Sequence, residues 1–141
     1  MEVTIPPAKR RKKAAAAEAL AQKENKGSPA AGELARKYGG LYIADEVQAG
    51  VGRTGKHYFG VKHWDAKPDI IVMAKGLGNG YPIGAIITTR AIADSMKGVL
   101  HYNTFGGGPM AIAAADAVMD VVENDDLAGN SKRVGDRLIA G

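Results

Sequence analysis

The chain has 141 residues, of which 45% are apolar and 24% are charged, a balance typical of one globular domain of ordinary size. It contains no cysteine, which excludes disulfides and thiolate metal sites, and no apolar run approaches the roughly 20 residues that a membrane-spanning helix needs. The net charge of +4 comes from residues 1–27, which hold seven Lys or Arg and three Glu, because the remainder holds twelve residues of each sign. We expect a soluble intracellular protein, and the choice between cytoplasm and mitochondrion stays open.

Residues 1–28 differ in kind from the rest and are expected to form a basic, disordered tail. Pro6 and Pro7 oppose regular structure, and residues 9–13 are five consecutive basic residues. The alternative is a nuclear-import or nucleic-acid patch at residues 9–13, which would make the protein a basic-tailed binding protein. Strongly salt-dependent nucleic-acid binding that vanishes on deleting the tail would favour that alternative.

From residue 29 the pattern alternates between helices and strands. Helices are predicted at residues 29–38, 91–96, 109–123 and 127–139, the third with one apolar face made of Met110, Ala113, Ala117 and Val121. Short apolar runs predict strands at residues 41–44, 70–73 and 83–88, and the third strand is close enough behind the second to be its hairpin partner. Residues 29–141 are therefore expected to form part of an α/β domain, with a mostly parallel sheet covered by helices.

Polar residues follow two of the predicted strands. Asp45 comes after the first strand, and Lys75 comes after the second, beside the glycine-rich loop at residues 76–80. Ligands of such sheets bind beyond the carboxyl ends of the strands. Taken singly, Asp45 has the pattern of a turn residue and Lys75 that of a surface lysine. One chemistry needs both groups, because a lysine that forms an imine with an aldehyde cofactor works together with a carboxylate that keeps the cofactor's pyridine nitrogen protonated.

Other kinds of site have little support. Residues 50–56 (GVGRTGK) match the start of a phosphate-binding P-loop, but His57 stands where Ser or Thr should hold magnesium, and no helix opening follows. His57, His63 and His101 do not cluster as metal ligands, so no metal site is expected. Asp45 and Glu46 would point to opposite sides of a strand and form no acid/base pair.

The segments around Asp45 and Lys75 match a known family. Residues 41–55 (LYIADEVQAGVGRTG) resemble the cofactor-binding signature of the class III aminotransferases, the ω-amino-acid group of fold-type-I pyridoxal phosphate (PLP) enzymes. Residues 68–76 (PDIIVMAKG) resemble the segment that carries the family's lysine, and residues 104–107 (TFGG) resemble the segment that reaches into the neighbouring subunit's site. Residues 74–80 and 101–105 most resemble the alanine–glyoxylate aminotransferase 2 branch, and a phospholyase branch shares much of the pattern.

The resemblance implies a three-layer αβα large domain, of which this chain holds a part, with PLP as cofactor and a homodimer as the assembly. It implies that Lys75 forms the Schiff base with PLP and moves the proton at the substrate α-carbon, while Asp45 pairs with the pyridine nitrogen. Val47 would pack against the ring, Gln48 would bond the phenolic oxygen, and Thr104 would bind the phosphate in the partner protomer. The implied reaction is transamination, from an amino acid such as alanine to a keto acid or aldehyde such as glyoxylate.

The chain also departs from the family. Gly108 stands where the family usually has Asn before the proline. The family's earlier phosphate cradle and ring-stacking aromatic have no counterpart in residues 1–28, and its later substrate-carboxylate arginine has none before Gly141. We therefore weigh two alternatives to a working transaminase: a truncated family member with little or no turnover of its own, and a phospholyase of the same class.

Overall fold

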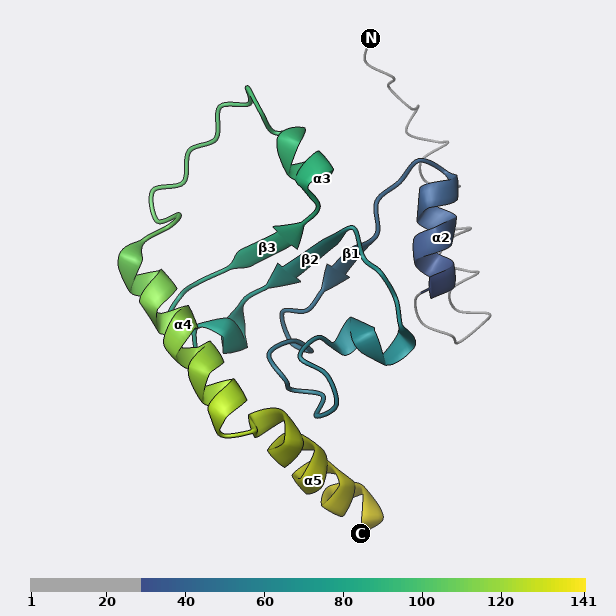
Figure 1. Cartoon of the computed structure of the whole chain (residues 1–141), viewed down its shortest axis with the longest axis vertical. Helices are drawn as coiled ribbons and strands as arrows, with labels where there is room; N and C mark the ends of the chain where they lie inside the picture. The colour runs from purple at the N-terminus through teal and green to yellow at the C-terminus, as the bar shows by residue number, and fades with distance from the viewer. Residues whose placement is uncertain (1–28) are drawn as a thin grey trace.

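The structure, a computed structural model, describes residues 29–141, so the predictions for residues 1–28 lie outside it. In chain order the elements are α2 (Pro29–Lys37), β1 (Ile43–Asp45), the 3-10 helix η1 (Gly60–Trp64), β2 (Ile70–Met73), the 3-10 helix η2 (Lys75–Leu77), β3 (Ala85–Thr88), α3 (Arg90–Asp94), α4 (Pro109–Asn124) and α5 (Leu127–Ala140) (Figure 1). The seven predicted helices and strands are confirmed, and their ends differ from the prediction by at most two residues. The two 3-10 helices were not predicted.

The three strands form one sheet in the order β1-β2-β3 (Figure 1). β1 and β2 run parallel, with Asp45 opposite Val72, and β2 and β3 run antiparallel, with Met73 opposite Ala85. The α/β class is therefore confirmed, and within the described residues the sheet is mixed, with β3 as the hairpin partner of β2. The physical reason is the connection at residues 74–84, which is too short to hold the crossover helix that a parallel pair needs.

The core of residues 29–141 is small and lies beside β1 and β2. One buried cluster consists of Ala44, Val61 and Ala66, and a second consists of Met73, Leu77 and Ala115. The first cluster joins β1 to η1, and the second joins the end of β2 and η2 to α4. Both clusters therefore meet the carboxyl ends of the two parallel strands, where the sequence predicts the site.

α2 lies beside the β1 edge of the sheet, and an aspartate near the start of β2 links the two (Figure 1). Asp69 Oδ2 accepts a hydrogen bond from the Tyr42 amide at 2.8 Å and another from Arg36 Nη1 of α2 at 3.1 Å. The side chain of Asp69 is only 19% exposed. This carboxylate therefore anchors both α2 and the chain entering β1.

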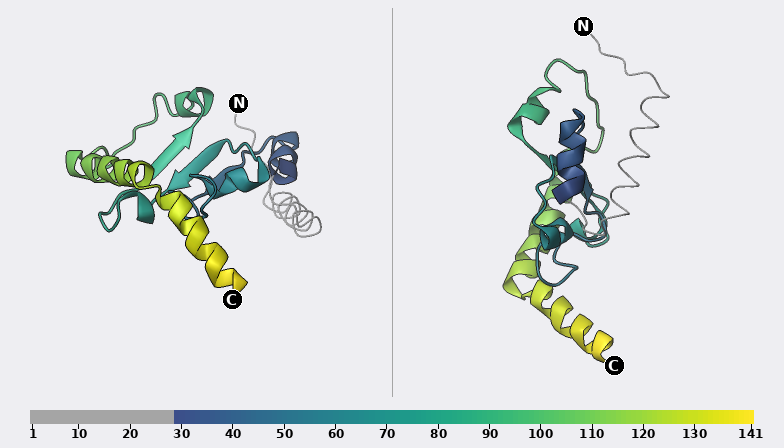
Figure 2. Two further views of the ribbon diagram at one scale, coloured as in Figure 1. Left: turned by 60° about the horizontal axis from the view of Figure 1, so that its bottom comes forward. Right: turned by 90° about the vertical axis from the view of Figure 1, so that its right-hand side faces the viewer.

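α4 follows the β3 side of the sheet, and α5 continues from it and projects away from the sheet (Figures 1 and 2). The side chains of α4 that the structure buries are Ala115 and Val122, whereas Met110 is 71% exposed and Val121 is 48% exposed. The residues that the sequence places on one apolar face are therefore not the ones that α4 buries within residues 29–141. Alanines lie all around the helix, so its pattern does not distinguish the face that contacts η2 from the faces beside it. No helix within residues 29–141 is both long and apolar enough to cross a membrane.

Candidate functional site

Asp45 and Lys75 lie at the same edge of the sheet. Asp45 is the last residue of β1, and Lys75 begins η2 two residues after β2 ends at Met73. Because β1 and β2 are parallel, their carboxyl ends meet at one edge, which faces the bottom of Figure 1. Both side chains are exposed. The fold therefore places a primary amine and a carboxylate where ligands of such sheets bind.

The Asp45 carboxylate closes a local turn. Its Oδ1 accepts a hydrogen bond from the Val47 amide at 3.1 Å. Its Oδ2 accepts none from the described residues, so one carboxylate oxygen stays available to a ligand. Val47 is half-buried and Gln48 is exposed in the turn that follows. Asp45, Val47 and Gln48 thus lie in one short stretch at the carboxyl end of β1.

The backbone at Lys75 is strained. Its φ is +46°, in the left-handed region that a side chain with a Cβ rarely adopts, and the preceding Ala74 is extended. The turn is held by hydrogen bonds from the Leu77 amide to the Ala74 carbonyl and from the Gly78 amide to the Lys75 carbonyl, both at 3.1 Å. Such strain costs on the order of 1 kcal/mol or more and clusters at functional sites. The sequence predicted a loop here and gave no signal of a left-handed lysine.

Lys75 and Asp45 line different clefts. Lys75 lines one of about 420 Å³ with Arg53, Gly76 and Asn79, and Asp45 lines another of about 400 Å³ that η1 borders. Residues 29–141 thus place the two groups at one edge without enclosing them in one cavity. Arg53 has no signal of its own in the sequence, where it is one residue of the glycine-rich stretch at residues 50–56. The sequence argues against a P-loop at residues 50–56, and in the structure no helix begins at His57, where a P-loop would need one.

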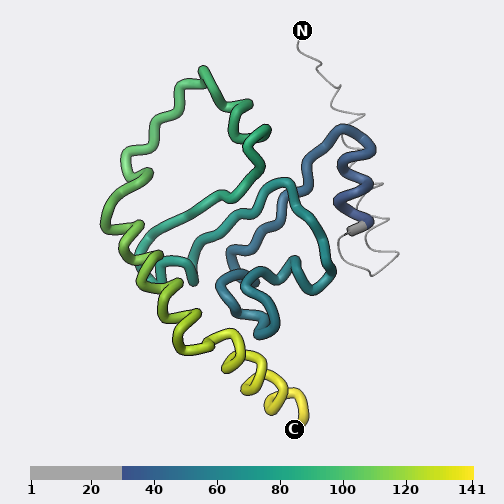
Figure 3. Tube along the Cα trace, viewed as in Figure 1, coloured from purple at the N-terminus to yellow at the C-terminus, as the bar shows by residue number. Residues whose placement is uncertain are grey.

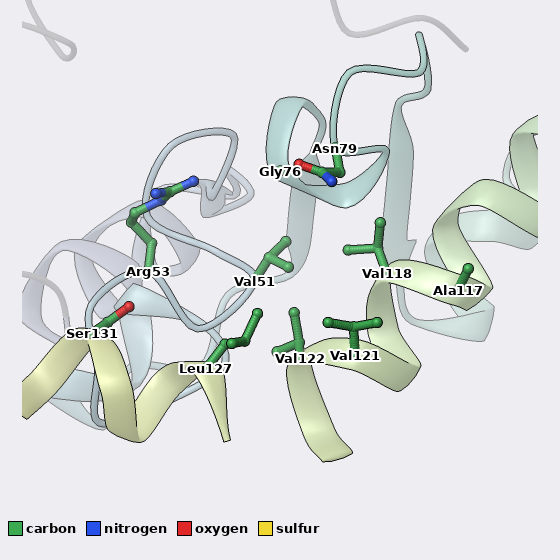
Figure 4. A pocket seen from close by; sticks show the side chains of 10 residues that line it. All are labelled: Val51, Arg53, Gly76, Asn79, Ala117, Val118, Val121, Val122, Leu127 and Ser131. Atoms are coloured by element: carbon green, nitrogen blue, oxygen red, sulfur yellow. The ribbon is translucent and has the colours of Figure 1, made fainter. Parts of the chain in front are cut away.

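A third, mostly apolar pocket of about 380 Å³ lies next to the Lys75 cleft (Figure 4). Val118, Val121 and Val122 of α4 and Leu127 of α5 face Val51 across it (Figure 4). Arg53, Gly76 and Asn79 line both this pocket and the Lys75 cleft. The lysine turn therefore contacts the side of the molecule formed by α4 and α5.

Thr104 is not brought to this edge within the chain. It is exposed in the connection between α3 and α4, which arches away from the sheet on the β3 side (Figures 1 and 3). Asn103 shapes the turn, because its Oδ1 accepts from the Phe105 amide at 3.2 Å. Gly108 is the N-cap of α4 and supplies no side-chain cap. Thr104 lines neither the Asp45 cleft nor the Lys75 cleft.

Two of the three histidines are neighbours, which the sequence did not predict. The rings of His57 and His63 lie 5.2 Å apart in an edge-to-face arrangement. Partial burial lowers the pKa of His57, and the positive charge of Lys56 lowers it further. Within residues 29–141, no group of three or more His, Asp or Glu side chains has the geometry of a metal site.

The chain is similar to known proteins over most of its length. The family model described as aminotransferase class III matches residues 22–141. Human mitochondrial alanine–glyoxylate aminotransferase 2 is 51% identical over 108 residues, which are 76% of this chain and 21% of that protein. Ethanolamine-phosphate phospho-lyase homolog 1 of Caenorhabditis elegans is 44% identical over 106 residues, which are 73% of this chain and 23% of that protein.

A solved structure shows the same fold. The ornithine aminotransferase of Toxoplasma gondii, whose active site has partial occupancy of PLP, superposes with a TM-score of 0.71 at 36% identity. That match covers 76% of this chain and 25% of the other. The chain thus spans about a fifth of the length of the curated relatives it matches.

Proposed function

The chain belongs to the class III aminotransferases. We propose that it holds one part of a PLP site used for transamination, the end of the sheet with Asp45 and Lys75, which we call the lysine edge. The proposed amino donor is an amino acid such as alanine, and the proposed acceptor is a keto acid or aldehyde such as glyoxylate. The identity to the human alanine–glyoxylate enzyme supports this choice. The observation that carries the proposal is the exposed, left-handed Lys75 at the strand edge that also holds Asp45.

The residues present fit PLP chemically. The cofactor offers an aldehyde, a pyridine nitrogen and a phosphate, and the site offers an exposed amine at Lys75 and an open carboxylate oxygen at Asp45. When bound, PLP supplies an electron sink for the carbanion formed at the substrate α-carbon. The donor set at this edge therefore matches two of the three groups that a PLP site must hold.

Each residue has a proposed task. The Lys75 Nζ holds the cofactor and then moves the proton at the substrate α-carbon, for which an amine on a strained, fixed turn is suited. The Asp45 carboxylate keeps a proton on the pyridine nitrogen. Val47 packs against the ring, and Gln48 donates a hydrogen bond to the phenolic oxygen. Thr104 binds the cofactor phosphate in a partner protomer, which agrees with its exposed position away from Lys75.

The test is reductive labelling. We expect purified chain mixed with PLP and treated with borohydride to carry the label on Lys75, and Lys75→Ala to lose it. Lys62→Ala is the matched control, because Lys62 is an exposed lysine in η1, outside the Lys75 cleft. Label spread evenly over the exposed lysines would overturn the proposed site.

A second candidate is a phospholyase of the same class, which the nematode relative favours. Two assays separate the candidates: amino transfer from alanine to glyoxylate, and release of inorganic phosphate from phosphoethanolamine. Because the chain spans only about a fifth of its relatives, we propose that it turns over little by itself, and the labelling result decides the site independently of either assay.

A further inference from the structure

Glu46 is the only charged side chain that the described part of the chain buries, at 3% exposure. It follows Asp45 directly, so an exposed acidic residue and an enclosed one are neighbours in the chain. A buried carboxylate is costly unless hydrogen bonds replace its water. Two do so here: the Gly60 amide donates to Oε2 at 2.8 Å, and the Val61 amide donates to Oε1 at 2.6 Å.

These two amides are the first of η1, which has no local cap. Its N-cap residue, Phe59, makes no side-chain hydrogen bond to the helix. The first amides of a helix lack partners within the helix and carry partial positive charge. Glu46 therefore caps η1 from 14 and 15 residues away, and a negative charge suits that position.

The backbone of Glu46 ties the same residue to β2. Its amide donates to the Val72 carbonyl at 2.9 Å, and its carbonyl accepts from the Gly50 amide at 2.9 Å. The surrounding loop is packed closely, because a Cβ added at Gly50 would lie 2.7 Å from the Glu46 carbonyl oxygen. A Cβ added at Gly60 would lie 2.8 Å from Ala49 Cβ and 3.3 Å from Glu46 Oε2. Strand, loop and 3-10 helix thus meet at one side chain.

We propose that Glu46 is a positioning residue for the PLP site. It fixes the backbone of its two neighbours, Asp45 and Val47, against β2, the strand that leads to Lys75. Asp45 lies opposite Val72, three residues before Lys75. A shift of the chain at Glu46 therefore changes the position of the Asp45 carboxylate relative to the Lys75 amine. This inference rests on the proposed function for its meaning, although its structural half can be measured without PLP.

The test compares two carboxylates that anchor the two ends of β1. Glu46→Gln keeps the volume and one acceptor oxygen, but it turns an NH2 group toward a backbone amide. Asp69→Asn is the matched control. Asp69 also accepts a hydrogen bond from a backbone amide, that of Tyr42, which lies at the end of β1 away from the site. Both variants should lose thermal stability, so stability alone does not decide the question.

The deciding readout is the bound cofactor. In Glu46→Gln we expect apparent PLP binding to weaken about tenfold or more, since hydrogen bonds to charged groups carry that much free energy. We also expect the absorbance maximum at saturating PLP, and its pH profile, to shift. Asp69→Asn should keep the wild-type spectrum. Equal spectra in Glu46→Gln and the wild type at saturation would show that Glu46 is merely structural and would overturn the inference.

A measurement on the chain without PLP separates failure of this inference from failure of the proposed function. Backbone NMR signals of Asp45 and Val47 should move in Glu46→Gln together with those of Gly60 and Val61, and they should stay in place in Asp69→Asn. If wild-type chain takes no label on Lys75, the proposed function fails while these signals still test the positioning. If the Asp45 and Val47 signals stay in place in Glu46→Gln, the positioning is refuted whatever the labelling shows.

Discussion

The stretch from Tyr42 to Ala74 and the stretch from Ser95 to the end are built in opposite ways. The first holds the buried Glu46 and the largely buried Asp69, and each carboxylate bonds backbone amides of a neighbouring element. The second leaves most of its large apolar side chains exposed, with Phe105 at 88% and Ile139 at 89% exposure. The lysine edge of the site is therefore held by internal hydrogen bonds, whereas the connection carrying Thr104 and helix α5 have few contacts of their own.

The largest expected difference comes from one substitution made in both regions. Gly60→Ala should lower the free energy of unfolding by about 3 kcal/mol, because the new Cβ would lie 2.8 Å from Ala49 Cβ in a closely packed loop. Gly135→Ala in α5 should raise it by up to about 1 kcal/mol, because nothing lies within 4 Å and alanine favours the helix. Urea unfolding measures both. A loss at residue 135 as large as that at residue 60 would contradict the contrast.

The next effect concerns two carboxylates that each form a salt bridge with a basic side chain. Asp69→Ala should cost about 2 kcal/mol, because it removes the partner of the Tyr42 amide and of Arg36 together. Asp136→Ala in α5 removes an exposed bond to Lys132 Nζ at 2.7 Å and should cost at most about 0.5 kcal/mol. Thermal unfolding at two salt concentrations measures both changes, and only the second should shrink clearly as salt rises. Equal costs would remove the distinction between the regions.

Tyr58 lies where the two regions meet. Its hydroxyl is buried without a hydrogen-bond partner among the described residues, and it lines an apolar groove with Met73 and with Glu123 of α4. Burial raises the pKa of Tyr58, and the charge of Glu123 raises it further. Tyr58→Phe should therefore stabilise the fold by about 1 kcal/mol, because it removes an unsatisfied polar group.

The raised pKa of Tyr58 predicts how the stability of the fold changes at alkaline pH. The pKa of Tyr58 is higher in the folded chain than in the unfolded chain, where a tyrosine ionises near pH ~10. Below that pH the phenol is protonated in both states and does not change the stability. As the pH rises from there to the folded pKa, the unfolded chain loses its proton first, so the free energy of unfolding falls. Tyr58→Phe should remove that part of the loss. Tyr81→Phe is the control, because it removes the same hydroxyl from a tyrosine that is 41% exposed. Identical alkaline profiles for Tyr58→Phe and the wild type would contradict the prediction.

The smallest effect lies at the start of α4. Gly108→Asn should stabilise α4 by a few tenths of a kcal/mol, because Asn can accept a bond from the first helix amides and the φ of −60° suits any residue. Amide exchange in the first turn of α4 measures the change. Gly107→Asn provides the comparison, because its φ of +67° makes a side chain strained there. Equal gains at both positions would show that capping is not the cause.

The sequence predicted the elements well where a periodic or apolar run decides them, as in β2 and at the start of α4. The hairpin of β2 and β3 followed from their short connection. The parallel arrangement, which placed Asp45 and Lys75 at one edge, followed from the polar residues at the ends of the first two strands. The apolar face of α4 could not be predicted, because alanines surround the helix and only packing selects a side. The left-handed backbone of Lys75 carries no mark in composition, since nothing local favours it. The role of Glu46 was also missed, because its partners are backbone amides, which any residue type supplies.

The distance along the sequence that the Glu46 hydrogen bonds span affects the order in which parts of the chain fold. They join residues 14 and 15 positions apart, and the Asp69 bond to the Tyr42 amide spans 27. The entropy cost of closing a loop grows with its length, by about 0.6 kcal/mol for each doubling, and short-range contacts form fastest. We therefore expect β1 and η1 to order early, whereas the buried cluster of Met73 and Leu77 is completed only by Ala115 of α4. During synthesis from the amino terminus, the lysine edge could take shape before α5 has been made.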